Sequence, residues 1–183
     1  VTVVCSGKEP LSHSSSITLF RGIPRIDIQN LITQNFADVQ HWAFSYNVPE
    51  AEVWHEEIGA ILKAKSVTEG GHYGTRNARF DWLTLNHFAD ITNEKHGITL
   101  SNADCAFMKM GNSALTNLDT QTSQLSVLAG GQVDGGNLGI LKQGGDSLFI
   151  QRFAIGTHQE FDAASSMRFS LEHQNSLVGG LIT

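Results

Sequence analysis

The clearest strand signal in the sequence is the stretch His41-Trp42-Ala43-Phe44-Ser45-Tyr46-Asn47-Val48. Every second side chain from Trp42 onward is large and apolar, and a β-strand places alternate residues on the same face. Pro49 follows at once, and proline lacks the backbone N–H that a neighbouring strand would need. We therefore expect a strand over 41–48 that buries one face and ends at the proline.

Short segments with β character lie on both sides of this stretch. They span 1–4, 17–20, 24–30, 53–59, 78–82, 97–101, 106–110, 124–129 and 148–155, and the segment 87–90 has the same character. In 24–30, Ile26 and Ile28 alternate with polar residues, so we expect these isoleucines to face the core. Arg25, Asp27 and Gln29 would then face outward.

Turn-forming residues separate these segments, as in Ser12–Ser16, Glu69-Gly70-Gly71 and Asp134-Gly135-Gly136. Many short strands without long helices between them are typical of an all-β fold. We expect a single domain over residues 1–183, built as a large antiparallel β-sandwich. One short helix is expected over 163–173, because Asp162 is a favourable N-cap and Ala164, Met167 and Leu171 would share one face.

The composition narrows the possible partners. The net charge is −6, only 16% of residues are charged, and no run of Lys or Arg could hold nucleic acid or an anionic membrane. No apolar stretch approaches the ~20 residues that a membrane span needs. Two cysteines, Cys5 and Cys105, are too few for a disulfide framework, and we expect two buried free thiols. The cellular location stays open.

None of the familiar catalytic or metal-binding motifs is present. His55-Glu56-Glu57 lacks the second histidine of a His-Glu-x-x-His zinc site, and His87 and Asp90 would point to opposite faces of a strand. The glycine-rich stretch 130–139 lacks the Gly-Lys-Ser/Thr ending of a phosphate loop. Gly-x-Ser-x-Gly is absent, and no two aspartates can be paired in space from sequence. We therefore predict no catalytic residue and no metal ligand in this chain.

Two long loops, 69–77 and 130–146, carry side chains suited to sugar hydroxyls. The first combines glycines with His72, Tyr73 and Arg76, and the second contains Asp134. Aromatic faces and paired hydrogen-bonding groups are what a sugar ring requires. We predict these four residues as the substrate-binding set, against the simpler interpretation that both loops are surface turns.

The order of several short motifs resembles the C-terminal β region of glycoside hydrolase family 38, the α-mannosidases. The opening resembles that family in 17–20 and 24–28, and 57–60 is a loose match to its Glu-Ile-x-Phe-Gly element. The strongest similarity is in the middle of the chain. The matching segments there are Ala78-Arg79-Phe80, Asn86–Ile91 and Gly97–Asp104, followed by 124–128 and 149–158. The family's Glu-Arg-Pro-Thr stretch is missing, and Thr157 replaces a proline.

This resemblance implies a supersandwich of the mutarotase-like type. It also implies that the chain is a fragment of a larger retaining α-mannosidase acting on α-mannosides. The aspartate nucleophile, the acid/base carboxyl and the zinc ion would lie in a preceding catalytic region on which this chain packs. Loops 69–77 and 130–146 would then border the substrate.

Two alternatives remain at this stage. One is a carbohydrate-binding sandwich, for which Trp54 and Trp82 are candidate platforms, although both lie in expected strands. The other is an interdomain packing module, which predicts exposed apolar surface on the isolated chain.

Overall fold

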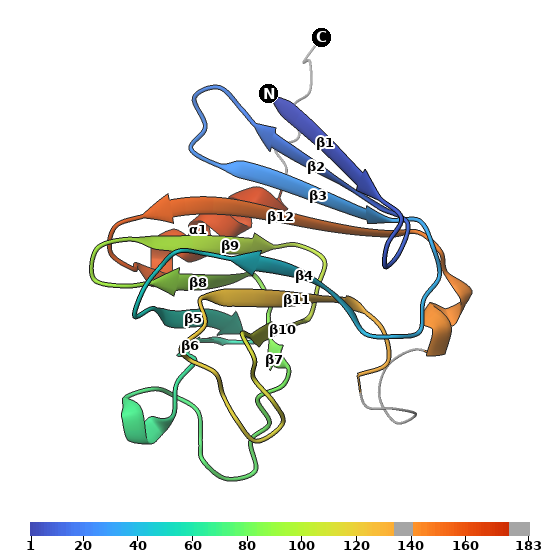
Figure 1. Ribbon diagram of the computed structural model, residues 1–183. Helices are drawn as coiled ribbons and strands as arrows, with labels where there is room; N and C mark the ends of the chain where they lie inside the picture. The colour runs from blue at the N-terminus through green and yellow to red at the C-terminus, as the bar shows by residue number, and fades with distance from the viewer. Residues whose placement is uncertain (134–140, 176–183) are drawn as a thin grey trace.

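The computed structural model describes residues 1–133 and 141–175. Its strands form two antiparallel sheets that pack face to face as a sandwich (Figure 1). The strands are β1 (Thr2–Gly7), β2 (His13–Leu19), β3 (Ile26–Ile32), β4 (Gln40–Ser45), β5 (Glu52–Glu57), β6 (Ala60–Lys63), β7 (Leu83–Thr84), β8 (Phe88–Thr92), β9 (Gly97–Asn102), β10 (Phe107–Met110), β11 (Gln124–Gly130) and β12 (Phe149–His158). The helices are α1 (Ala163–Gln174) and two 3₁₀ turns, η1 (Val67–Glu69) and η2 (Leu141–Gly145).

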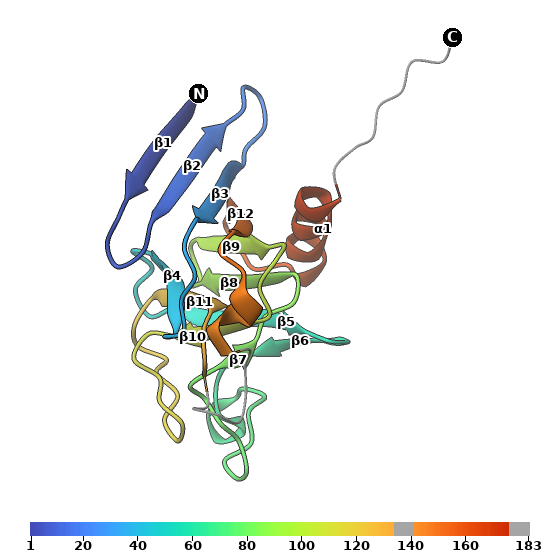
Figure 2. The ribbon, with the colours of Figure 1, turned by 90° about the vertical axis from the view of Figure 1, so that its right-hand side faces the viewer.

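The larger sheet has eight strands in the order β1-β2-β3-β12-β9-β8-β5-β6, and the smaller has four in the order β4-β11-β10-β7. The smaller sheet lies over one face of the large sheet, and α1 lies against the opposite face (Figure 2). Strands β1, β2 and β3 extend past the edge of the smaller sheet in both views (Figures 1 and 2). The expected all-β sandwich with one C-terminal helix is therefore confirmed.

The core lies between the two sheets, where the alternate residues of facing strands meet. Phe153 of β12 and Leu100 of β9 are fully buried, and Phe44 of β4 packs edge-on against Phe153 with ring centroids 5.1 Å apart. A second, smaller cluster of Leu11, Ile32 and Phe36 closes one end of the sandwich. The alternation that predicted the strand at 41–48 therefore marks a core-facing strand, although β4 itself ends at Ser45.

Two local expectations were wrong. Residues 13–16 form part of β2 instead of a turn, because His13–Ser16 pair with β1 on one side and β3 on the other, and this pairing overrides the low strand preference of serine. The segment 78–82 is not a strand, and only Leu83–Thr84 pair with β10. The expected strand at 53–59 is β5 up to Glu57, and the chain then turns at Gly59 (φ 86°) into β6.

The cysteines also differ from expectation. Both thiols are free, but Cys5 is exposed on the edge strand β1, because nothing among the described residues covers that strand. Cys105 is partly buried and packs against the main core, and burial raises the pKa of its thiol to about 12.

Helix α1 begins as the sequence indicates, because the Asp162 side chain accepts a hydrogen bond from the N–H of Ser165 at 2.8 Å. Its orientation is the reverse of what an apolar stripe suggests. Ser166 and Ser170 are buried against the sheet, whereas Ala164 and Leu171 are exposed. Among the described residues, no helix is both long and apolar enough to cross a lipid bilayer.

The contact between α1 and the sheet is polar because it surrounds a buried carboxylate. Asp90 of β8 is fully buried, and its Oδ2 accepts hydrogen bonds from Thr99 Oγ1 at 2.5 Å and from Ser166 Oγ at 3.3 Å. His158 at the end of β12 places its Nε2 2.8 Å from the same oxygen. The hydrogen bond to Asp90 raises the pKa of His158, and partial burial opposes that shift.

This geometry predicts a pH dependence of stability. Because the folded-state pKa of His158 is raised, the stabilisation from its ion pair with Asp90 is fully present below the ordinary histidine pKa of ~6.5 and disappears as the pH rises through the raised value. The difference in unfolding free energy between the wild type and His158→Asn should shrink accordingly from pH 5.5 to pH 8.5 in urea titrations. The exposed variant His96→Asn is the control, and a difference that is constant with pH contradicts the ion pair.

Candidate functional site

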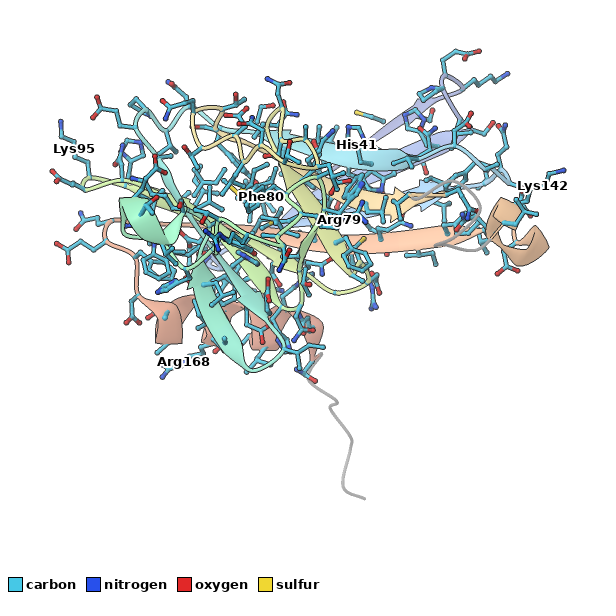
Figure 3. All side chains as sticks on the ribbon, turned by 90° about the horizontal axis from the view of Figure 1, so that it is seen from below. His41, Arg79, Phe80, Lys95, Lys142 and Arg168 are labelled. Carbon is cyan, nitrogen blue, oxygen red and sulfur yellow. The ribbon has the colours of Figure 1, made fainter. Side chains whose placement is uncertain are left out.

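Loop 69–77, which the sequence predicted to contact sugar, follows the edge strand β6 and the turn η1 at one end of the sandwich. This is the underside seen in Figure 3, where the neighbouring residues Arg79 and Phe80 lie near the centre of the view. Ser66 caps the short turn η1 through its hydroxyl, and Gly70 ends that turn in the left-handed region (φ 82°). Backbone hydrogen bonds from Gly71 to Ser66 and from Tyr73 to Lys65 then hold the loop against β6.

The side chains of His72 and Tyr73 do not converge on one pocket. The ring of His72 contacts Trp54 edge-on, with centroids 5.9 Å apart, whereas the ring of Tyr73 stacks on His55 at 6.0 Å. Trp54 and His55 are consecutive residues of β5, so they point to opposite faces of the sheet. Arg76 is exposed, and Asp134 lies outside the described residues. The substrate-binding role of these four residues stays a prediction.

Tyr73 forms part of a buried polar contact instead. Its hydroxyl donates to Glu57 Oε1 at 2.9 Å and lies 2.8 Å from His55 Nε2, while His55 Nδ1 lies 2.8 Å from the carbonyl oxygen of Thr84. Burial lowers the pKa of His55, against opposing contributions from Glu57 and the Thr84 carbonyl. Burial also raises the pKa of Tyr73, and the hydrogen bond to Glu57 acts in the same direction. The group fixes the loop to the core.

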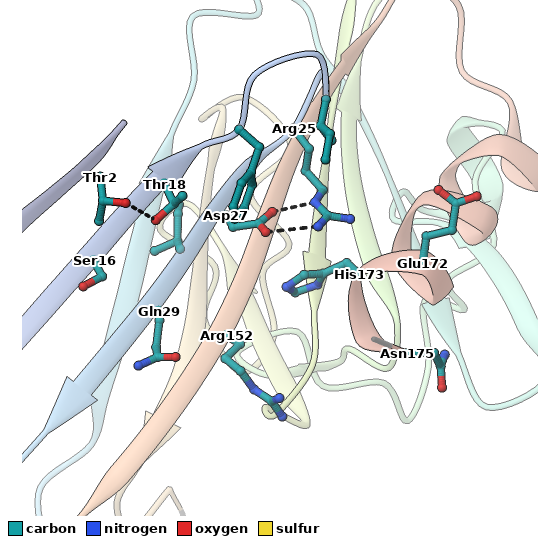
Figure 4. Close-up of a pocket in the computed structure, with 13 residues that line it drawn as sticks. Thr2, Ser16, Thr18, Arg25, Asp27, Gln29, Arg152, Glu172, His173 and Asn175 are labelled. Carbon is teal, nitrogen blue, oxygen red and sulfur yellow. Dashed lines mark hydrogen bonds and ion pairs between the residues drawn. The ribbon is translucent and has the colours of Figure 1, made fainter. Parts of the chain in front are cut away.

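A cleft that could hold a ligand lies elsewhere in the described part of the chain. It has a volume of about 910 Å³ and is bounded by β2 and β3 on one side and the last turn of α1 on the other (Figure 4). The side chains that line it come from β1, β2, β3, β12 and α1 and the turn before β3. They are Thr2, Ser16, Thr18, Phe20, Ile23, Arg25, Asp27, Ile28, Gln29, Arg152, Glu172, His173 and Asn175.

Two arginine–aspartate pairs hold charged groups in fixed positions around this cleft. Arg25 contacts Asp27 through Nε at 2.5 Å and Nη2 at 3.0 Å. Arg152 forms the same two-point contact with Asp104, at 3.0 Å and 2.6 Å. Burial tends to raise the pKa of Asp104, but its hydrogen bonds with Arg152 outweigh that effect, so the pKa is lowered.

The helix supplies a third group. His173 of α1 is partly buried, and its Nδ1 lies 2.9 Å from Ser101 Oγ. Burial lowers the pKa of His173, Asp27 opposes this, and the nearby charges of Arg25 and Arg152 add to it. The imidazole is therefore neutral at pH 7 and carries one N–H donor and one acceptor nitrogen.

The sequence contains only part of the signal for this cleft. The alternation in β3 places Arg25, Asp27 and Gln29 on the outward side of the sheet, as expected. Their convergence with Arg152 and His173, more than 120 residues away along the chain, depends on β12 pairing with β3 and on α1 folding back over the sheet. In residues 1–133 and 141–175, no group of three histidine, cysteine or carboxylate side chains is arranged to hold a metal ion.

The two tyrosines of the chain give a matched test of the Tyr73 contact. Tyr73→Phe leaves buried His55 without the hydroxyl partner, and an unsatisfied buried polar group costs about 1–3 kcal/mol. Tyr46→Phe is the control, because the Tyr46 hydroxyl is buried with no hydrogen-bond partner among the described residues. Urea denaturation should show a loss for the first variant and little change for the second. Equal effects would contradict the structural role of Tyr73.

Comparison with known proteins finds a similarity in three-dimensional structure but none in sequence. No family model matches the sequence, and the curated proteins contain no match either. Among solved structures, an α-mannosidase from Enterococcus faecalis V583 is similar in fold, with a TM-score of 0.58 and 11% sequence identity. The similarity covers 82% of this chain but only 16% of that protein. The fold of this chain therefore resembles one part of a much larger α-mannosidase.

Proposed function

We propose that this chain is the β-sandwich module of a larger, α-mannosidase-like glycoside hydrolase and that it catalyses nothing alone. The observation that carries the proposal is the structural match over 82% of this chain to a sixth of an α-mannosidase. The order of motifs in the sequence supports the same family. Nucleophile, acid/base group and zinc ion are assigned to a separate catalytic region.

Exposed apolar surface supports a packing role within such a protein. Val1, Val3 and Val4 are 90%, 52% and 65% exposed on and beside β1, and Leu19 at the end of β2 is 49% exposed. A second apolar surface is the outer face of α1, where Leu171 is 41% exposed. Soluble proteins tend to cover such clusters with another domain or subunit. Both surfaces are therefore proposed contacts with the catalytic region.

The proposal extends to the rim of the substrate site. His72 and Arg76 are exposed on loop 69–77, where Nδ1 of His72 accepts a hydrogen bond from the Lys63 N–H, whereas the Tyr73 hydroxyl is engaged with Glu57. With Asp134, these residues form the proposed border of an α-mannoside site. The carbohydrate-binding alternative is supported by a different feature, the polar cleft beside α1.

An aryl α-mannoside assay with added zinc tests the main proposal. The 183-residue chain should show no hydrolysis above buffer, and the longer protein that contains it should turn over the substrate. Hydrolysis by the chain alone would show that its aspartates include a catalytic pair. A longer protein without activity on any α-mannoside would contradict the family assignment.

A double variant of the longer protein tests the rim. His72→Ala/Arg76→Ala should raise KM about tenfold, equivalent to ~1.4 kcal/mol of lost binding, with kcat changed less. The matched control is Lys95→Ala/His96→Ala, which removes a cation and an imidazole from the exposed turn between β8 and β9. Unchanged KM in the loop variant would remove these residues from the substrate site.

A further inference from the structure

We propose that the cleft between β2–β3 and the end of α1 binds a neutral carbohydrate. The cleft's volume of about 910 Å³ falls within the range of ~300–1,000 Å³ that small-molecule sites occupy. Its polar side chains come from strands and a helix of the sandwich, which hold them more rigidly than surface loops would. This site is separate from loop 69–77, since none of His72, Tyr73 and Arg76 lines the cleft.

The first argument is the fixed orientation of the hydrogen-bonding groups. The side chains of Arg25 and Asp27 are 21% and 27% exposed, so each keeps a solvent-facing edge while the two-point contact restricts its movement. A guanidinium beside a carboxylate offers donors and acceptors a few ångströms apart, which matches two adjacent sugar hydroxyls. Figure 4 shows this pair facing His173 and Glu172 across the cleft.

The second argument is charge. The charged side chains that line the cleft are Arg25 and Arg152 against Asp27 and Glu172, which sum to zero. Asp104 pairs with Arg152 from behind, so each arginine has an aspartate partner and the sum with Asp104 included is −1. Burial also lowers the pKa of His173, which disfavours a positive charge there. A site for phosphate or another anion would leave positive charge unpaired. The pairing of both arginines therefore disfavours an anion and suits a ligand with many hydroxyls.

The third argument is the mixture of polar and apolar side chains among the other residues that line the cleft. Thr18 and Thr2 face the cleft with their hydroxyls 3.0 Å apart, and the exposed Gln29 adds an amide with both donor and acceptor atoms. Phe20 and Ile23 are 49% and 48% exposed at the rim, which gives an apolar surface for the C–H face of a sugar ring. Polar groups with one apolar edge are the combination that a sugar needs.

This inference goes beyond the proposed function and does not depend on it. All the groups belong to the described part of this chain, so binding is tested on the 183-residue chain without any catalytic region. If the longer protein shows no mannosidase activity, the proposal of sugar binding in the cleft still stands. If the cleft binds no sugar, the proposal that the chain is a mannosidase module still stands.

The test is an NMR titration of the chain with methyl α-mannoside, methyl α-glucoside and methyl β-galactoside, with inorganic phosphate as the anionic probe. At least one neutral sugar should shift resonances of Gln29 and His173. Asp27→Asn should weaken its binding about tenfold or more, because a hydrogen bond to a charged group is stronger than one to a neutral amide. Gln29→Ala, which changes an exposed side chain, should weaken binding without affecting folding.

The matched control is Asp81→Asn. Arg79 and Asp81 form the same two-point pair two residues apart, but neither residue lines the cleft. Affinity should be unchanged in this variant. Three outcomes overturn the proposal: no sugar binds, phosphate binds in preference to the sugars, or Asp27→Asn and Gln29→Ala bind as tightly as the wild type.

Discussion

The backbone hydrogen bonds of β12 are the constraint on which the rest of the structure depends. This ten-residue strand pairs with β3 on one side and β9 on the other, and so joins the N-terminal meander to the remaining strands of the large sheet. The two faces of β12 serve different purposes. Phe153 points into the core, while Arg152 and His158 point to the side on which α1 lies.

Asp90 explains why the helix packs with its serines inward. A buried carboxylate requires hydrogen-bond donors, and Thr99, Ser166 and His158 supply them at the one place where α1 meets β8 and β9. An apolar side chain in place of Ser166 would remove one of these three donors from the buried carboxylate. Ala164 and Leu171 of α1 are exposed on its outer side, whereas Phe169 is partly buried next to Gly156 of β12.

The outward side of the large sheet thus divides into two regions. Helix α1 covers β8, β9 and β12, whereas in the described part of the chain it does not reach β1 and β2, which border the polar cleft. Val4 is exposed on this side of the sheet, and Val3 and Leu19 are exposed on the opposite face of the same strands. Exposed apolar side chains of this kind suit packing on a neighbouring region.

The sequence by itself determined the fold class, most strands and the start of the helix, because period-two alternation and the Asp162 cap are local properties. It also predicted that Arg25, Asp27 and Gln29 share an outward face. It was wrong where pairing overrides local preference, as for the serines of β2 and the segment 78–82. Only the tertiary structure decided that His72 and Tyr73 diverge, that the serine face of α1 is buried, and that Arg152 and His173 meet Arg25 across a cleft. These arrangements depend on strand register and helix placement between residues far apart in the chain, which no local pattern encodes.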